Sequence, residues 1–573
     1  MNKFYIIGAV ALTMGLASCD DMLDKEPLDV IPNTPALWSN DQTVESECNR
    51  LYNNFLGYGN GQTLGSFYFN ALNDDQADPS FANWANTNVP GSSTNWNSPY
   101  QEIRGCNYII TNVREYKPAS AAKWEGIARL NRAYQYYLLV RCYGDVQWMD
   151  RPLGLNDTEE IYGKRDPRDE VMDKVLEDLN FAVSNIGARS SRSAWSNDMA
   201  QAMKAEICLY EGTYAKYRTT AENGQAPDAA RANKYLNEAA NAAKAVMDAG
   251  YTLTSDYQEV YNTIGLADCP EVIFFKPYSQ PSASFGHGTI AYTNSTTTMK
   301  GLTKDAFNNF LFLDGKPLAT TSMDTSDKGV WDPDTKTMNI ENLLAVRDQR
   351  LKVLIDPQLG FGNNPYLRYA GCPELTSATA YTVRKFYTDK LSDYFLKTIG
   401  QNTTSAPIFW LAKVMLEYAE AKAELGTLTQ ADLDATINKL QARAGLPAMT
   451  ISPAADPANN MGVSPLLWEI RRVRRCELMF NGGRYWDLIR WHQLELLDSE
   501  KHPDILLGAN LSDVDEEFFW DKKHEKLVVT VVDGYIRPTA DKNRYYEPRQ
   551  YLYPIPSGQI GLNNNLEQNP LWK

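Results

Sequence analysis

The sequence predicts a mainly α protein in which pairs of helices support an irregular, loop-rich lobe with short strands. Apolar residues recur at helical spacing through residues 41–250 and again after residue 404. Between these parts, residues 251–404 are rich in Gly, Ser, Thr, Asn and Pro, with short β-like runs such as "EVIFF" (271–275). The 573 residues exceed what one hydrophobic core supports, so several packed parts are expected.

The first residues have the pattern of a bacterial lipoprotein signal peptide. Lys3 precedes "FYIIGAVALTMGLA" (4–17), an apolar stretch too short for a stable membrane span. The overlapping "LASC" (16–19) matches a lipobox, which implies that residues 1–18 are removed and that Cys19 is lipidated. Two or more acyl chains give stable anchoring where one does not.

The residues after Cys19 indicate where the anchored protein lies. Asp20 and Asp21 resemble a surface-export signal of outer-membrane lipoproteins, so we expect the protein to face outward from the cell. Residues 19–40 are proline-rich and aperiodic, which predicts an extended arm. No later apolar run reaches the roughly 18 residues of a membrane span.

Residues 41–250 form the predicted N-terminal helical part. In "GIARLNRAYQYYLLVRCYG" (126–144) the apolar residues follow helical spacing, and Gly144 is expected to end the helix. In "DAARANKYLNEAANAAKAVMDAG" (228–250), Asp228 is an N-cap candidate and Gly250 a C-cap candidate. The predicted helices of this part span residues 41–57, 98–117, 120–143, 168–187, 198–218 and 228–250.

Residues 405–573 form a C-terminal helical part with a loop-rich tail after residue 496. Three helical stretches are predicted here, at 407–426, 429–446 and 464–491, and the lobe contains another at 339–355. In the stretch 464–491, Ser464 is the N-cap, Pro465 lies in the first turn, and Gly482–Gly483 break the helix.

The composition and the absence of known motifs argue against nucleic-acid binding and catalysis. The net charge of -15 disfavours nucleic acid, and the arginines of "RRVRR" (471–475) alternate with apolar residues, as expected beside a core. With four histidines and no H-E-x-x-H, G-x-S-x-G or phosphate-binding glycine loop, nothing nominates an enzyme. "NDDQAD" (73–78) could bind calcium through its carboxylates, but a solvated or capping loop is the favoured reading; no other cofactor is expected.

The seven cysteines after Cys19 show no metal or redox pattern, since no C-x-x-C occurs. Cys106, Cys142 and Cys208 fall in helical patterns and are expected to be buried. Cys269 and Cys372 both occur as Cys-Pro-Glu in loops, and a disulfide between them stays open.

Four features together resemble the SusD/RagB family of outer-membrane nutrient-binding lipoproteins, over nearly the whole mature chain. They are the lipobox followed by "LDKEP" (23–27), "RAYQYYLLVRCYGDV" (132–146), "RRVRRCELMFNGGRYWDLIRW" (471–491) and the closing "YLYPIPSGQIGLNNNLEQNPLW" (551–572). The chain departs from the family at its end, where Leu571 and Trp572 stand in place of the usual Gly and aromatic residue. The motifs themselves are structural: Phe480, Trp486, Leu488 and Ile489 are core candidates, and Glu477, Arg484 and Asp487 are expected to form ion pairs.

The resemblance implies about four tetratricopeptide-like helix pairs that support a ligand-bearing lobe. It also implies a partner, a SusC-type TonB-dependent transporter over which the lipoprotein acts as a lid. The expected function is non-catalytic capture of glycans at the cell surface for import. Two alternatives stay open: a lid for a non-glycan nutrient such as peptides, and a surface adhesin.

Ligand contacts are expected on loops, where aromatic faces stack on sugar C–H groups and polar side chains bind hydroxyls. Trp84 and Trp96 lie in the polar stretch 73–96 with Asp75, while Tyr292 and Trp331 lie in the lobe. We expect these five residues to contact the ligand, although buried tryptophans that fold the loops onto the scaffold are an equal alternative. If these residues contact the ligand, Trp96→Ala or Trp331→Ala should abolish most binding with the melting temperature nearly unchanged.

Overall fold

The computed structural model describes residues 35–278, 286–293, 300–334, 337–359, 377–514, 520–521, 526–527, 530–539 and 541–573. Cys19, most of the predicted arm and Cys372 lie outside the described residues. Pro35–Trp38, at the end of that arm, forms the short helix α3, and Trp38 is buried.

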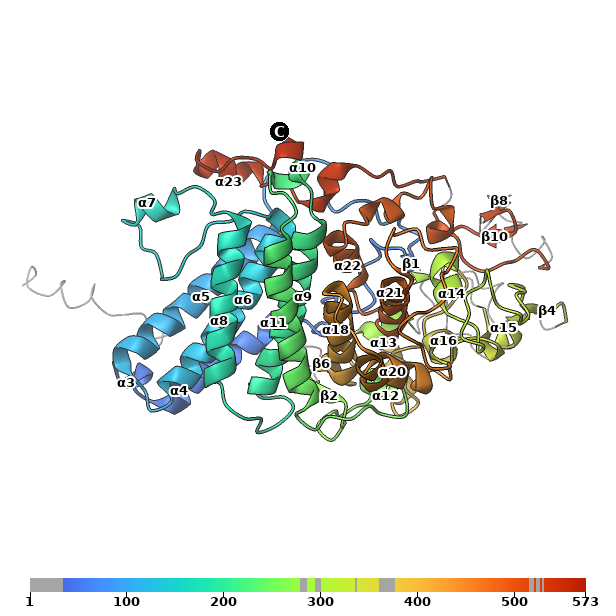
Figure 1. Ribbon diagram of the computed structural model, residues 1–573, viewed down its shortest axis with the longest axis horizontal. Coiled ribbons are helices and arrows are strands. Elements are labelled where there is room, and N and C mark those ends of the chain that lie inside the picture. The colour runs from blue at the N-terminus through green and yellow to red at the C-terminus, as the bar shows by residue number, and fades with distance from the viewer. Residues whose placement is uncertain are drawn as a thin grey trace, which may run out of the picture.

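Long helices lie side by side in the N-terminal part (Figure 1). Helix α5 (Thr94–Tyr116) packs against α6 (Ala121–Tyr143), and α6 packs against α8 (Arg168–Asn185). Helix α9 (Asn197–Tyr217) packs against α8 and α11 (Ala229–Met247). The predicted mainly α fold is confirmed, while the tetratricopeptide-like geometry of the pairs stays a prediction. Shorter helices are α4 (Asp41–Arg50), α7 (Thr158–Ile161), α10 (Thr220–Asn223) and α23 (Ser557–Leu562).

Several helix ends follow the local sequence. Gly144 ends α6 with a φ of 74°, a left-handed value that glycine adopts without strain. The Asp228 carboxylate accepts a hydrogen bond from the Arg231 backbone N–H at 2.9 Å, so it is the N-cap of α11. That helix ends at Met247, slightly before the predicted Gly250.

The C-terminal helices pack onto this layer. Helix α18 (Leu411–Glu424) contacts α9, α11 and α21 (Pro465–Glu477). Ser464 caps α21 by accepting from the Leu467 backbone N–H, and Gly482–Gly483 separate α21 from α22 (Arg484–Arg490), as predicted.

Three predicted helices are interrupted. Residues 406–410 form strand β6 (Ala406–Trp410) rather than the first turns of α18, because they pair with β2 (Val272–Lys276). Residues 429–446 split at Thr436 into α19 (Gln430–Ala435) and α20 (Ile437–Arg443). Residues 339–355 contain two short helices instead of one, α15 (Glu341–Ala345) and α16 (Arg350–Leu354).

The described part of the lobe is irregular, as expected, with short helices and two-stranded antiparallel sheets. Its other helices are α12 (Glu259–Asn262), α13 (Thr289–Thr293), α14 (Lys304–Asn309) and α17 (Asp393–Lys397). In the lobe β4 (Val330–Asp332) pairs with β5 (Thr337–Asn339), and β3 (Gly301–Leu302) pairs with β1 (Gln76–Ala77) of the N-terminal part. The tail adds β7 (Trp520–Asp521) with β8 (Lys526–Leu527), and β9 (Val531–Val532) with β10 (Tyr535–Ile536).

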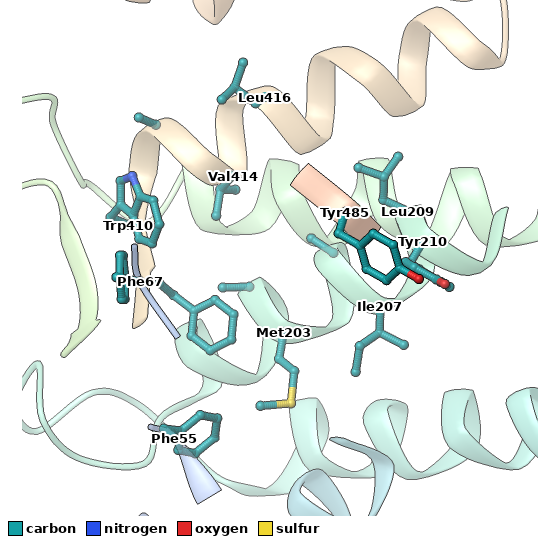
Figure 2. Packing of buried hydrophobic residues seen from close by; sticks show 14 of the residues in the cluster. Phe55, Phe67, Met203, Ile207, Leu209, Tyr210, Trp410, Val414, Leu416 and Tyr485 are labelled. Atoms are coloured by element: carbon teal, nitrogen blue, oxygen red, sulfur yellow. The ribbon is translucent and has the colours of Figure 1, made fainter. Parts of the chain in front are cut away.

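One buried apolar cluster runs from Trp38 to Leu566, so the helical parts and the lobe share a core. Figure 2 shows Met203 and Ile207 of α9 and Val414 of α18 within this cluster. Among the helices of the described ranges, none is both long and apolar enough to cross a membrane.

Candidate functional site

Strands β1 and β3 join the two loop regions that the sequence nominates for ligand binding. Gln76 pairs with Leu302 and Ala77 with Gly301. The Thr303 backbone N–H also donates to the carbonyl of Asp75 at 3.0 Å. The stretch 73–78 is therefore fixed against the lobe, and residues beside it meet side chains that lie more than 200 positions away in the sequence.

Asp75 is buried and holds the loop in place through an arginine. It is 3% exposed, and Arg475 donates to its carboxylate at 2.7 Å. Asp74 accepts two hydrogen bonds from Arg484, at 2.8 and 2.7 Å. The stretch 73–78 is thus mostly buried rather than solvated, and it is in part a capping loop, because the Asn73 side-chain oxygen accepts from the backbone N–H groups of Asp75 and Gln76 at 2.8 and 2.9 Å. Asp75 as a ligand contact stays a prediction.

Burial favours the neutral form of both aspartates and acts to raise their pKa values, but the nearby arginines oppose this effect more strongly at Asp74 than at Asp75. For Asp74, Arg475 and Arg484 outweigh burial, and its pKa lies well below the usual range. For Asp75, burial and the adjacent Asp74 charge outweigh Arg475, and its pKa rises to about 6. Arginines therefore bind two of the three carboxylates that the sequence offered to calcium, and Lys300 pairs with the third, Asp78.

Trp84 and Trp96 lie in the interior, which matches the structural alternative for them. Trp96 belongs to α5, where its ring packs edge-on against Tyr143 at 5.0 Å. The Trp84 indole N–H donates to the carbonyl of Tyr545 at 2.6 Å. The two side chains are 7% and 4% exposed, respectively, so neither offers an open ring face to a sugar in this structure. Trp84 lies in a loop that is folded onto the scaffold, and Trp96 lies in α5 rather than in a loop.

Tyr292 meets an aromatic residue that the sequence analysis did not select. Its ring packs edge-on against Phe69 at 5.3 Å, and both side chains are partly exposed. Lys300 lies beside them, 5.9 Å from the Phe69 ring, and forms an ion pair with Asp78 at 2.8 Å. We call these four residues the Phe69–Tyr292 surface.

The backbone next to this surface is held in an uncommon conformation. Tyr68 has a φ of 68°, a left-handed value that costs a non-glycine residue free energy. Its N–H donates to the Phe480 carbonyl at 2.7 Å, and its hydroxyl donates to the Lys300 carbonyl at 2.8 Å. These bonds fix the direction in which Phe69 leaves the chain.

The Asp78 carboxylate stays ionised beside the aromatic pair. Burial alone would raise its pKa, but the charge and hydrogen bond of Lys300, together with bonds from Ser80, hold the pKa below its usual range. The surface therefore combines ring faces with an acceptor and a donor. The aromatic run "SFYFN" (66–70) was the sequence signal for Phe69, but its short length gave no indication of exposure.

Trp331 lies on the β4–β5 hairpin, opposite Met338 and partly exposed. This hairpin lies at the far end of the lobe from α13, which carries Tyr292 (Figure 1). It is tied to the tail through the Lys328–Asp513 ion pair at 2.7 Å. Trp331 and Tyr292 therefore do not form one contact surface.

The arginines of residues 471–475 border the core, as predicted. Arg471 pairs with Glu424 at 2.9 Å and Arg474 with Asp487 at 2.9 Å, while Glu477 pairs with Arg350 at 2.8 Å. Cys269 is a buried free cysteine, and its potential partner Cys372 lies outside the described residues. Among the described residues, no cluster of His, Cys, Asp and Glu is suited to hold a metal ion.

Comparison with known proteins gives a consistent result. A family model described as "SusD family" matches residues 270–572, and one described as "Starch-binding associating with outer membrane" matches residues 44–209. SusD-like protein P2 of Formosa agariphila is 24% identical over 83% of this chain and 79% of its own length.

Solved structures share the fold. A SusD-like carbohydrate binding protein from Bacteroides fragilis is 19% identical, with a TM-score of 0.68 over 93% of this chain and 100% of its own. Surface glycan-binding protein A from Bacteroides fluxus is 15% identical, with a TM-score of 0.55 over 93% and 99%. Because a SusD model covers more than half of the sequence and the arrangement of helices and lobe agrees with it, this chain belongs to the SusD/RagB family.

Proposed function

We propose that this protein captures glycans at the cell surface through the Phe69–Tyr292 surface, without catalysis. The single observation that carries the proposal is the Tyr292–Phe69 ring pair at 5.3 Å beside the Asp78–Lys300 ion pair. Aromatic faces stack on sugar C–H groups, and a carboxylate with an ammonium group binds hydroxyls. The names of related proteins, which include a carbohydrate binding protein and a surface glycan-binding protein, support this ligand class.

The anchoring and partner follow from the sequence and the family. In this proposal, lipid on Cys19 holds the protein to the outer membrane, and Asp20 and Asp21 direct it to the outer face. It hands its ligand to a SusC-type TonB-dependent transporter. The outer-membrane association in the description of the matching family model supports this location.

The test is a panel of polysaccharides and peptides on affinity gels, followed by titration of the best oligosaccharide. Tyr292→Ala should weaken its affinity by about tenfold, the value of one stacked ring, with little change in melting temperature. Tyr162→Ala, which removes a 49% exposed ring next to the distant helix α7, is the matched control and should bind normally.

The outcomes separate the alternatives. Retention on peptide gels alone would favour a non-glycan nutrient. An isolated lipoprotein that never co-purifies with a large β-barrel would favour an adhesin. Normal glycan binding by both Tyr292→Ala and Phe69→Ala would exclude this surface, and loss with Trp331→Ala alone would move the site to the β4–β5 hairpin.

A further inference from the structure

A cavity of about 340 Å³ lies where α6, α9, α18, α21 and α22 meet. Figure 1 shows α9, α18 and α22 next to one another, and each of the others contacts one of these helices. The volume falls within the range of small-molecule sites, about 300–1,000 Å³. None of the four residues of the Phe69–Tyr292 surface lines it, so it is a separate feature.

Glu417 of α18 is the unusual residue in the wall of this cavity. Three glutamates lie on one face of that helix, and two of them have close partners: Glu420 accepts from Arg490 at 2.6 and 2.8 Å, and Glu424 accepts from Arg471 at 2.9 Å. Glu417 is 1% exposed, and neither of its carboxylate oxygens has a hydrogen-bond partner among the described residues. Leaving such a group unpaired is costly, which points to a function.

Three further polar atoms without a described partner belong to residues that line the same cavity. They are Arg141 Nε, Arg474 Nη1 and the Tyr210 hydroxyl. The wall also contains Trp486, whose ring lies 4.0 Å from the Arg141 guanidinium. One cavity thus gathers donors, acceptors and aromatic surface from five helices.

The state of Glu417 suits a ligand that both donates and accepts hydrogen bonds. Burial raises its pKa to about 8, although Lys413 lowers it, so the carboxyl group is mostly protonated at neutral pH. It can then donate from its O–H and accept at its other oxygen. Sugar hydroxyls have the same dual character, while the two arginines supply donors and the aromatic walls supply stacking surface.

We propose that this cavity binds a single sugar unit, held by hydrogen bonds to Glu417, Tyr210, Arg141 and Arg474. This site goes beyond the glycan capture proposed above and does not depend on it. A neutral monosaccharide and a uronic acid share the hydroxyl chemistry, and the carboxylate of the acid would additionally meet the Arg141 guanidinium.

The experiment uses the full chain with millimolar glucose, galactose, mannose, xylose, glucuronate and galacturonate, followed by ligand-observed NMR and thermal unfolding. We expect at least one sugar to bind the unaltered protein. Glu417→Leu should weaken that binding by about tenfold or more and raise the melting temperature, because an apolar side chain replaces an unpaired buried acid. Tighter binding of the uronic acids would support a carboxylate contact with Arg141.

Two tyrosines of α9 provide a matched pair of variants. The Tyr214 hydroxyl donates to Glu222 at 2.9 Å, whereas the Tyr210 hydroxyl has no described partner. Tyr210→Phe should weaken sugar binding with no loss of stability, and Tyr214→Phe should lower stability with binding unchanged. This pair tests the proposal even if Glu417→Leu does not fold.

Several results would overturn the proposal. One is that no sugar of the panel binds, in which case the cavity holds water only. The others are that Glu417→Leu or Tyr210→Phe binds like the unaltered protein. Tyr292→Ala should retain monosaccharide binding while losing oligosaccharide affinity, so failure of this site and failure of the Phe69–Tyr292 surface are distinguishable.

Discussion

Trp96 belongs to α5, and its side chain is buried against Tyr143 although its sequence neighbours are small and polar. Side chains of this size stabilise a fold through buried area, and ring pairs add to that. Tyr292 belongs to the same chemical class but is only partly buried. Exposure, rather than residue type, therefore separates a structural aromatic residue from a candidate ligand contact.

Trp96→Ala should lower the free energy of unfolding by about 3–5 kcal/mol, because it opens a cavity in the core. Denaturant unfolding followed by tryptophan fluorescence and circular dichroism would measure this loss. Tyr292→Ala is the comparison and should unfold like the unaltered protein. A Trp96→Ala protein of normal stability that no longer binds glycan would return Trp96 to the ligand site.

At the scale of elements, α18 carries three acids in one helix face with different surroundings. Arginines hold Glu420 ionised, and its pKa lies below the usual value although burial opposes this. Glu417 has no such partner, and its pKa rises from an ordinary 4.5 to about 8. Two glutamates one turn apart on the same helix thus have pKa values that are shifted in opposite directions.

The pH dependence of Glu417 follows from its protons. Between pH 4.5 and about 8 the folded chain keeps a proton that the unfolded chain has lost, so this residue lowers stability as pH rises. Glutamine does not titrate. The stability gain of Glu417→Gln over the unaltered protein should therefore grow across this window, to at most about 5 kcal/mol at about 1.4 kcal/mol per pH unit.

This gain is measured as the difference in the free energy of unfolding between Glu417→Gln and the unaltered protein, at pH 4.5 and at about pH 8. The same change at Glu177, exposed on α8, is the control and should give no comparable gain. A gain that stays constant with pH would mean that Glu417 is ionised in the folded protein and that nearby cations balance its charge.

The sequence predicted the elements better than their contacts. The α6 stop at Gly144, the Asp228 cap and the Ser464–Pro465 start all depend on local chemistry, and all three are confirmed. Strand β6 was missed because its partner β2 lies 130 or more positions away. The burial of Trp84, which depends on Tyr545, could not be inferred from neighbouring residues for the same reason.

The candidate site was predicted only in part. Tyr292 was selected from its residue type and loop context, and it lies on the surface proposed here. Phe69 and Lys300 were not selected, because only the pairing of β1 with β3 brings them together. Asp75 was selected for its charge, but charge alone does not distinguish a ligand contact from a partner of a buried arginine.

At the scale of the whole molecule, the proposed function places the protein at the outer membrane through residues that precede the described fold. Cys19→Ala should leave a chain that folds normally but no longer partitions with membranes. Fractionation with a labelled fatty-acid precursor measures this change. Replacing Asp20 and Asp21 is the matched control for lipidation and should keep the label but reduce protease accessibility on whole cells. A labelled Cys19→Ala protein in the outer membrane would contradict the anchor.

The arginines that hold Asp75 and Asp74 lie 400 and 410 positions further along the chain. At a synthesis rate of about 5–20 residues per second, the loop would emerge from the ribosome roughly 20–80 s before its partners exist. During that interval its two acids lack the arginines that hold them in the fold, whereas Asp78 finds Lys300 only 222 positions further along the chain. A chain that stops before residue 475 would lack both arginines, so the two buried acids of this loop would stay without the cations that hold them in the fold.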